Sequence, residues 1–209
     1  MTCIQAVIFD IGGVLVRIQD RTPSREWERR LGISEGELDE IVCTNPVAQQ
    51  ALVGNATTDQ MWAYVGRHLA LPPDELAALR ADFWRVQEGD TELLAFIQSL
   101  RPRYKTATIS DAWPGAREIL REYVNDDTFD VCVFSAEEGV RKPDPEIYRR
   151  ALSRLDVAPQ EAVFCDDRLP NVDGARRIGM HAFQFSNTHQ TREEIVRLLR
   201  SQGDSSIEA

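Results

Sequence analysis

Side chains that could do chemistry follow four short apolar runs of the chain. Asp10 follows VIF, Ser110 follows TATI, Lys142 lies in the loop after VCVF, and Asp166 and Asp167 follow AVFC. In an open parallel sheet, ligands bind beyond the carboxyl ends of the strands, so these side chains would meet at one edge. Each of them alone is typical of a turn, a helix cap or the protein surface. Four strand ends with mutually complementary groups favour an active site instead.

The set fits phosphoryl transfer through a covalent intermediate. A carboxylate can attack phosphorus to form an aspartyl phosphate, and Asp10 is the candidate nucleophile. Gly12 and Gly13 would let backbone N–H groups approach the transferring oxygens. Ser110 would donate a further hydrogen bond to these oxygens, and Lys142 would supply a positive charge.

The acidic residues of the set predict a bound cation. Asp10, Asp166 and Asp167 would repel an anionic substrate unless a positive charge lay between them. Carboxylate oxygens are the ligands that Mg²⁺ prefers in proteins. We therefore expect Mg²⁺ as the cofactor, held by these side chains.

The elements that must position these residues alternate between strands and helices. Continuous apolar runs are typical of strands that are buried on both faces. The predicted strands are Ile4 to Phe9, Thr106 to Ile109, Val131 to Phe134, Ala162 to Cys165 and, more weakly, His181 to Phe185. Apolar residues at three- and four-residue spacing predict helices over Glu92 to Leu100, Pro114 to Tyr123, Pro145 to Leu155, Pro170 to Ile178 and Arg192 to Arg200. The pattern predicts the α/β class, with a parallel sheet and helices on both faces.

Residues 17–87 contain no convincing strand and predict a helical insertion. Amphipathic patterns cover Ser24 to Leu31, Glu35 to Val42, Asp59 to Leu69 and Asp74 to Val86. The candidate inner-face residues are Trp27, Leu31, Met61, Trp62, Leu76, Leu79 and Phe83, which we interpret as core packing and not as a cofactor site. The segment from Cys43 to Thr58 is expected to be a loop on which the choice of substrate depends.

The composition limits the classes of partner. The chain has 209 residues, of which 43% are hydrophobic, and a net charge of -10, which disfavours nucleic acid and acidic membrane surfaces. Its apolar stretches are far shorter than the ~20 residues of a membrane helix, and its amino terminus lacks the pattern of a signal peptide. The cysteines, Cys3, Cys43, Cys132 and Cys165, show no paired spacing. We expect buried, reduced thiols in the cytoplasm and no zinc site.

The chain resembles the haloacid dehalogenase-like hydrolase superfamily in four motifs, which are VIFDIGGVLV, ATISD, GVRKPDPEIY and VFCDDRLPNVDGARRIGM in that order. The resemblance covers the whole chain and implies a Rossmann-like parallel sheet with a small all-helical cap inserted after the first strand. The segment NPVAQQALVGNATTDQMW further resembles the branch that includes bacterial glucose-1-phosphatases and the amino-terminal domain of soluble epoxide hydrolase. The implied boundaries are 1–16 and 88–201 for the core domain, 17–87 for the cap and 202–209 for a flexible tail.

The resemblance also implies a role for each site residue. Asp10 and Lys142 are catalytic; Ile11, Gly12, Gly13, Ser110, Asp111 and Lys142 bind the substrate phosphate; and Asp10, the backbone carbonyl of Gly12, Asp166 and Asp167 hold Mg²⁺. The implied function is a Mg²⁺-dependent phosphatase that acts through an aspartyl phosphate. Its substrate would be a small phosphorylated metabolite, of which a sugar phosphate is one candidate.

The chain departs from the family pattern at Gly12. Phosphatases of the superfamily usually carry a second Asp there as general acid and base, and loss of such a group typically costs ~10² to 10⁴ in rate. A substrate with a stable leaving group, such as an anomeric or acyl phosphate, would need less protonation, and a water could use the space that Gly12 leaves. Asp111 and Asp144 are further candidates to replace the acid, although each is equally typical of a turn or a cap. One alternative is a slow or non-catalytic relative that binds phosphate or a protein partner. Another is a metal-independent 2-haloacid dehalogenase, which the acid pair after AVFC disfavours.

Several other residues are interpreted as structural. Arg17 and Arg21 could hold a second anionic group of the substrate, but solvation or pairing with an acid is the commoner role of such residues. His68, His181 and His189 lie outside the motifs. The amphipathic segment THQTREEIVRLL would pack equally well on its own domain or in a dimer, so we expect a monomer or a weak homodimer.

Overall fold

The computed structural model describes residues 3–85, 87–121, 123, 125 and 128–200. Its centre is a parallel sheet of five strands in the order β5-β4-β1-β6-β7. The strands are β1 (Ala6–Phe9), β4 (Lys105–Ser110), β5 (Val131–Phe134), β6 (Ala162–Asp166) and β7 (His181–Gln184). Each of the five predicted strands is present, and the parallel pairing confirms the predicted α/β class.

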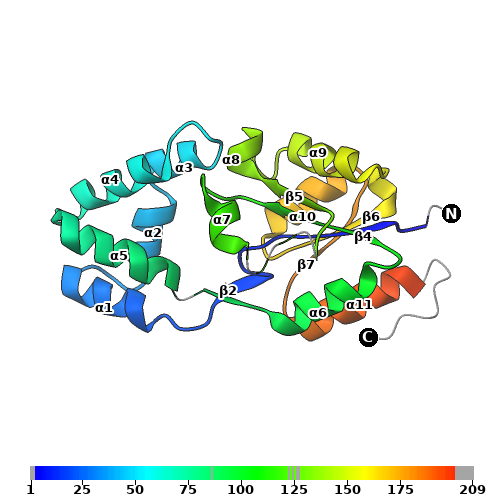
Figure 1. The fold of residues 1–209 in the computed structure, drawn as a ribbon, viewed down its shortest axis with the longest axis horizontal. Coiled ribbons are helices and arrows are strands. Elements are labelled where there is room, and N and C mark those ends of the chain that lie inside the picture. Colours follow the sequence, from blue (N-terminus) through cyan, green and yellow to red (C-terminus); the bar gives the residue numbers. More distant parts are fainter. Residues whose placement is uncertain (1–2, 86, 122, 124, 126–127, 201–209) are drawn as a thin grey trace.

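Helices cover both faces of this sheet (Figure 1). They are α6 (Thr91–Leu100) and α11 (Thr188–Arg200) on one face, and α9 (Pro145–Leu155) and α10 (Leu169–Arg177) on the other. Phe9 of β1 belongs to the first apolar cluster, whereas the preceding residue, Ile8, belongs to the second. Successive side chains of a strand point to opposite faces, so a strand covered on both sides has to be apolar throughout.

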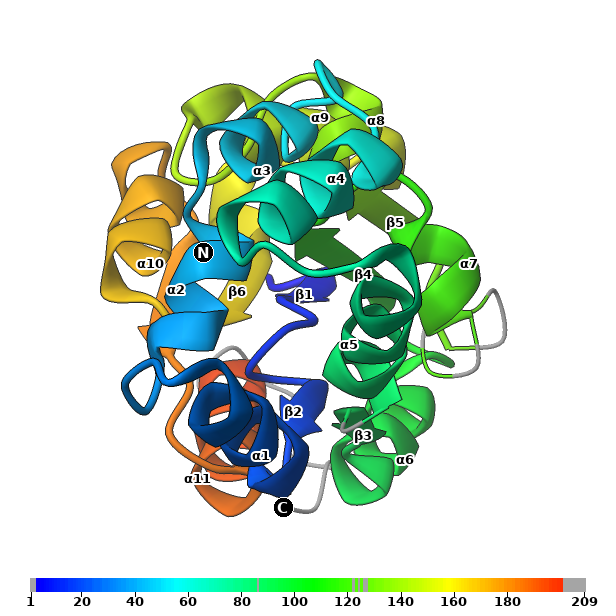
Figure 2. The same cartoon turned by 90° about the vertical axis from the view of Figure 1, so that its left-hand side faces the viewer.

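Five further helices, here called the cap helices, lie together beyond one edge of the sheet (Figures 1 and 2). They are α1 (Thr22–Leu31), α2 (Glu37–Cys43), α3 (Pro46–Ala51), α4 (Thr58–His68) and α5 (Pro73–Arg85). Their apolar cluster is separate from the two that flank the sheet, and it includes the buried residues Trp27, Met61, Trp62 and Leu79. Leu31, Leu76 and Phe83 pack against that cluster. These side chains therefore form a core, as the amphipathic patterns predict.

A small antiparallel ribbon joins the cap helices to the sheet, so the prediction that residues 17–87 lack a strand is wrong. The ribbon consists of β2 (Val16–Ile18) and β3 (Gln87–Gly89). Arg17 of β2 forms an ion pair of 2.6 Å with Asp90, although the two residues are 73 positions apart. Asp90 also accepts a hydrogen bond from the N–H of Leu93 and so caps α6. The segment that enters the cap helices and the segment that leaves them are therefore connected by this ion pair.

Helix α3 occupies the segment that was expected to be a loop. Its N-cap is Asn45, whose side chain accepts a hydrogen bond of 2.8 Å from the N–H of Ala48, and Pro46 starts the helix. Smaller differences concern α7 (Ala116–Leu120), which is shorter than predicted, and α11, which begins earlier. A short helix that was not predicted, α8 (Ser135–Glu138), follows β5.

The expectation of buried thiols holds for only one of the four cysteines. Cys165 is buried in β6, whereas Cys43 and Cys132 are partly buried and Cys3 is exposed. Burial raises the pKa of the Cys43 thiol to about 12, so it stays protonated and unreactive at neutral pH.

Of the histidines, His68 stacks on Tyr64 of the same helix.

The described part of the chain contains no helix with both the length and the apolar character needed to cross a bilayer.

Candidate active site

Three neighbouring strands carry the predicted acid and hydroxyl side chains at their carboxyl ends. Strand β1 lies between β4 and β6, Asp10 directly follows it, and Ser110 and Asp166 are the last residues of its two neighbours. The exposed fractions are 6% for Asp10, 4% for Ser110 and 0% for Asp166. Buried polar groups are costly unless they have partners. The partners of these side chains therefore define the site.

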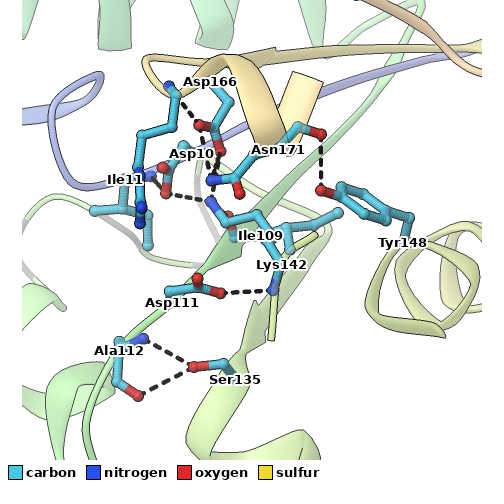
Figure 3. A network of polar contacts seen from close by, with 11 residues as sticks. Asp10, Ile11, Ile109, Asp111, Ala112, Ser135, Lys142, Tyr148, Asp166 and Asn171 are labelled. Atoms are coloured by element: carbon cyan, nitrogen blue, oxygen red, sulfur yellow. Dashed lines mark hydrogen bonds and ion pairs between the residues drawn. The ribbon is translucent and has the colours of Figure 1, made fainter. Parts of the chain in front are cut away.

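Lys142 connects the acids of two strands (Figure 3). Its Nζ lies 2.8 Å from Oδ1 of Asp10 and 2.7 Å from Oδ2 of Asp166, and its side chain is fully buried. It also donates a hydrogen bond of 2.8 Å to the carbonyl oxygen of Ile109. Burial alone would lower the pKa of Lys142, but the carboxylates of Asp10 and Asp166 outweigh it, and the net pKa is raised. Lys142 is thus a fixed positive charge between the acids.

Asp10 is held by its own backbone as well as by Lys142. The N–H of Ile11 donates to Oδ1 of Asp10 at 2.6 Å, and the N–H of Asp10 donates to the carbonyl oxygen of Cys165 at 2.9 Å. Burial raises the pKa of the Asp10 carboxyl well above its ordinary range, against the opposing effect of Lys142, and the nearby Asp166 raises it further. An additional positive charge near Asp10 would favour its ionised form.

Asp166 is oriented by a chain of hydrogen bonds from α10 and α9 (Figure 3). Oδ1 of Asp166 accepts from the N–H of Arg168 at 2.8 Å, and Nδ2 of Asn171 donates to both carboxyl oxygens at 3.0 and 3.1 Å. The hydroxyl of Tyr148 in turn donates to the carbonyl oxygen of Asn171 at 2.8 Å. Sequence reasoning missed Tyr148, because a Tyr on the apolar face of a helix is typical of core packing.

Asp10, Asp166 and Asp167 form a cluster that could hold a metal ion. One carboxylate oxygen from each lies within 4.8 Å of the others. Burial raises the pKa of Asp167, and the charge of Asp166 raises it further. Hard cations such as Mg²⁺ bind sets of oxygen atoms, and Lys142 alone supplies one positive charge against three acids. The donor set therefore fits a divalent cation.

The two glycines after Asp10 lie in different surroundings. A Cβ on Gly13 would be 2.5 Å from Oδ2 of Asp167, and its φ of +80° is one that other residues rarely adopt. A Cβ on Gly12 would meet no described atom within 4 Å. Gly13 is therefore required by the backbone and by Asp167, whereas Gly12 leaves open space.

The loop after Ser110 is tied to the loop that carries Lys142. The carboxyl of Asp111 accepts a hydrogen bond of 2.9 Å from the backbone N–H of Lys142. The hydroxyl of Ser135 accepts from the N–H of Ala112 at 3.0 Å and donates to its carbonyl oxygen at 3.3 Å. Ser135, which sequence reasoning did not single out, thus braces this loop.

Asp144, the other candidate replacement for the missing acid, lies outside this group. It is exposed, and its side chain accepts a hydrogen bond of 2.8 Å from the N–H of Glu146. It is the N-cap of α9, which is the structural role that its position before Pro145 indicates.

The cap helices reach the sheet edge through hydrogen bonds and an aromatic contact. Nη1 of Arg141 donates to Oε1 of Gln49 on α3 at 2.6 Å, and the hydroxyl of Thr58 donates to the carbonyl oxygen of Pro114 at 2.6 Å. Trp84 of α5 packs edge to face on Trp113, with ring centroids 5.6 Å apart.

Arg17 and Arg21, the two candidates for a second anion site, form ion pairs. Arg17 pairs with Asp90, and Arg21 pairs with Asp39 on α2. The structure therefore supports a role in ion pairing for both arginines.

Comparison with known proteins connects this geometry to a family. A family model described as haloacid dehalogenase-like hydrolase matches residues 4–179. The chain is 26% identical over 202 residues to the sesquiterpene phosphatase astK of Aspergillus oryzae, covering 95% of this chain and 98% of that protein. It is 28% identical over 211 residues to a D-ribitol-5-phosphate phosphatase of Bacteroides thetaiotaomicron, covering 95% and 100%. A solved structure of a HAD family enzyme from Bacteroides thetaiotaomicron, in complex with magnesium and inorganic phosphate, matches with a TM-score of 0.72 at 21% identity, covering 88% of this chain and 94% of that one.

Proposed function

We propose that this chain, which belongs to the haloacid dehalogenase-like hydrolase family, is a Mg²⁺-dependent phosphatase that hydrolyses a small phosphorylated metabolite. The reaction would pass through an aspartyl phosphate on Asp10. The observation that carries this proposal is the buried triplet of Asp10, Lys142 and Asp166, with Nζ of Lys142 within 2.8 Å of both acids.

Each residue of the site would have a distinct task. Asp10 attacks phosphorus, while Lys142, Ser110 and the backbone N–H groups of Ile11, Gly12 and Gly13 bind the oxygens of the phosphoryl group. Asp111 braces this set through the N–H of Lys142. Fixed donors of this kind stabilise the charge that develops on those oxygens in the transition state.

The side chains of Asp10, Asp166 and Asp167, with the backbone carbonyl of Gly12, would hold Mg²⁺. When bound, Mg²⁺ neutralises negative charge on the phosphate and on the acids around it. Asn171 and the N–H of Arg168 keep Asp166 oriented for this purpose. The spacing of the three acids supports this assignment.

The names of the relatives support phosphate esters as the substrate class. One relative is a D-ribitol-5-phosphate phosphatase and another is a sesquiterpene phosphatase, so the organic part of the substrate differs between them. A sugar phosphate stays one candidate for this chain. We propose that residues 17–87 act as a cap that selects the organic part, and that 1–16 and 88–201 form the catalytic core. The cytoplasmic location and the monomeric or weakly dimeric state stay predictions.

Gly12 supports a second candidate function. A chain that lacks the usual acid at this position could bind phosphate, or a protein partner, with little or no turnover. The open space beside Gly12 contains no described side chain that would replace that acid directly.

Hydrolysis of p-nitrophenyl phosphate with and without Mg²⁺ separates these functions. We expect the wild type to turn over this ester only with Mg²⁺, and Asp10→Asn to lose that turnover. Asp59→Asn is the matched control, because Asp59 lies outside the four motifs and has an 84% exposed side chain on α4, and it should keep full activity for this ester. Binding of inorganic phosphate without any turnover, measured by calorimetry, would favour the binding protein instead.

A further inference from the structure

The structure leaves one proton of the proposed reaction without a source. This inference rests on the proposed phosphatase function. An alkoxide leaving group needs a proton, and Gly12 supplies no side chain to donate one. Another acid at the site can take this role.

Four acids other than the nucleophile come into question, and the structure separates them. Asp144 is exposed and serves as the N-cap of α9. Asp166 and Asp167 belong to the acid cluster that would face the cation. Asp111 belongs to neither group, because it lies at the end of β4, directly after Ser110.

One hydrogen bond orients the carboxyl of Asp111, and two more fix the backbone of the residue that follows it. Its Oδ1 accepts the hydrogen bond from the backbone N–H of Lys142, while Ser135 holds the following residue, Ala112, by both backbone groups. Within the described residues, Oδ2 of Asp111 makes no hydrogen bond. Figure 3 shows this carboxyl beside the backbone of Lys142, whose side chain runs on to Asp10 and Asp166. One oxygen is thus fixed, and the other stays without a partner among the described residues.

The surroundings of Asp111 raise the pKa of its carboxyl. Burial raises its pKa, Lys142 and Arg141 from the loop before α9 lower it, and Asp166 from β6 raises it again, so the net pKa is raised. A carboxyl with a raised pKa keeps its proton at higher pH, as a general acid must.

We propose that Asp111 is the general acid and base of the hydrolysis. When Asp10 attacks phosphorus, the bond between phosphorus and the leaving oxygen breaks, and Oδ2 of Asp111 gives its proton to that oxygen. The product alcohol departs and a water takes its place. The Asp111 carboxylate then accepts a proton from this water, whose oxygen attacks phosphorus. The bond from phosphorus to Asp10 breaks, inorganic phosphate leaves, and both acids return to their starting forms.

The dependence of rate on the leaving group tests this role. Asp111→Asn keeps the size of the side chain and an oxygen that can accept from the N–H of Lys142, but it removes the proton. With Mg²⁺, we expect it to lower kcat for an alkyl phosphate by ~10² to 10⁴. The loss for p-nitrophenyl phosphate, whose leaving group is stable without a proton, should be far smaller.

Controls separate this proposal from the phosphatase function itself. Asp144→Asn should leave both rates unchanged. An equal loss by Asp111→Asn for both esters would overturn the acid role and leave Asp111 as a brace, while Asp10→Asn would still abolish turnover. No turnover of either ester by the wild type with Mg²⁺ would overturn the phosphatase function and this inference together.

A titration without substrate or metal gives an independent readout. Protein labelled with ¹³C at the Asp carboxyl carbons can be followed by NMR as the pH changes, and Asp111→Asn identifies the signal of Asp111. We expect that signal to titrate above the ordinary range of Asp. Titration at or below that range would contradict the proposal.

Discussion

Buried acids have different partners at the sheet edge and in the cap helices. At the sheet edge, Asp10 and Asp166 are buried beside each other and share the ammonium group of Lys142. In the cap helices, the buried Glu28 accepts hydrogen bonds from the backbone N–H groups of Gly36 and Leu38. The carboxylate of Glu28 thus stabilises the backbone of the turn before α2. The carboxylates of Asp10 and Asp166 instead bind the charged side chain of Lys142.

This difference shows where each region can do chemistry. Acids that face one another and a lysine bind cations and anions well, because their charges are already desolvated and oriented. The rest of the buried cap core is almost entirely apolar. Its contacts with the sheet edge include the hydrogen bond from Arg141 to Gln49 and the packing of Trp84 on Trp113. The cap helices can therefore shape the space around a substrate, while the proposed reacting groups all lie at the ends of the strands or in the loops that follow them.

Removal of Lys142 breaks the balance of charge at the sheet edge and should have the largest effect. Lys142→Met leaves two buried acids facing each other, which should lower the free energy of unfolding by about 3 kcal/mol and abolish turnover. Urea unfolding measures the first effect. Part of the lost stability should return when Mg²⁺ is added, because a divalent cation also neutralises the acids.

The chain offers a matched control, since Lys105 is its only other lysine. Lys105 is exposed and donates to the carbonyl oxygen of Leu155, so Lys105→Met should cost about 1 kcal/mol at most. An equal decrease in the free energy of unfolding for the two variants would show that the ion pairs of Lys142 do not stabilise the sheet edge more than an exposed lysine does.

Gly54 tests the contact between the cap helices and the sheet. A Cβ at this position would collide with the carbonyl oxygen of Ala136 in α8, and its φ is +73°. Gly54→Ala should therefore displace the cap helices from α8 and lower kcat/KM for a phosphate ester by roughly tenfold. Steady-state kinetics on an alkyl phosphate measures this change.

Gly32→Ala separates the collision from backbone strain. Gly32 has a similar φ of +68°, but a Cβ there would meet no described atom within 4 Å. It should cost about 1–2 kcal/mol of stability without changing kcat/KM. A similar loss of kcat/KM in both variants would mean that the contact at Ala136 has no part in catalysis.

The smallest expected effect concerns the ribbon that joins the two regions. It is a change in how the free energy of unfolding depends on pH. Burial raises the pKa of Asp90, but hydrogen bonds from Thr188 and Leu93 and the charge of Arg17 outweigh it, and the net pKa is lowered. A lowered folded pKa contributes stability above the ordinary pKa of about 4, and this is lost as the pH falls through the folded pKa.

Asp90→Asn keeps the cap of α6 but removes the charge. It should lower the free energy of unfolding by about 1 kcal/mol at pH 7, and the difference from the wild type should become smaller in acid. Unfolding in urea at pH 7 and pH 3 measures both values. A difference that stays constant between these pH values would show that the charge of Asp90 is not what stabilises the ribbon.

The sequence predicts the site better than it predicts the cap. Asp10, Ser110 and Asp166 could be placed together because continuous apolar runs mark the strands, and parallel strands end at one edge. The ribbon of β2 and β3 could not be predicted in this way. Its strands have three residues each, too few to show a period, and their pairing depends on how the whole insertion folds.

Other parts were missed although the chain carries a signal for them. Asn45 followed by Pro46 is typical of a helix start, and α3 does begin there. The roles of Tyr148 and Ser135 had no such signal, because a hydroxyl that braces a neighbouring loop has no characteristic spacing. The choice of Asp111 over Asp144 likewise needed the structure, since only their surroundings differ.

The central claim is that the carboxylate of Asp10 attacks phosphorus. Rapid-quench mass spectrometry of the wild type, mixed with Mg²⁺ and p-nitrophenyl phosphate in ¹⁸O-labelled water, tests it most directly. We predict a phosphoryl group on the peptide that contains Asp10, and ¹⁸O in the released phosphate but not in that peptide. Turnover that leaves no phosphoryl group on this peptide at any time, or ¹⁸O in the carboxyl of Asp10, would contradict the account.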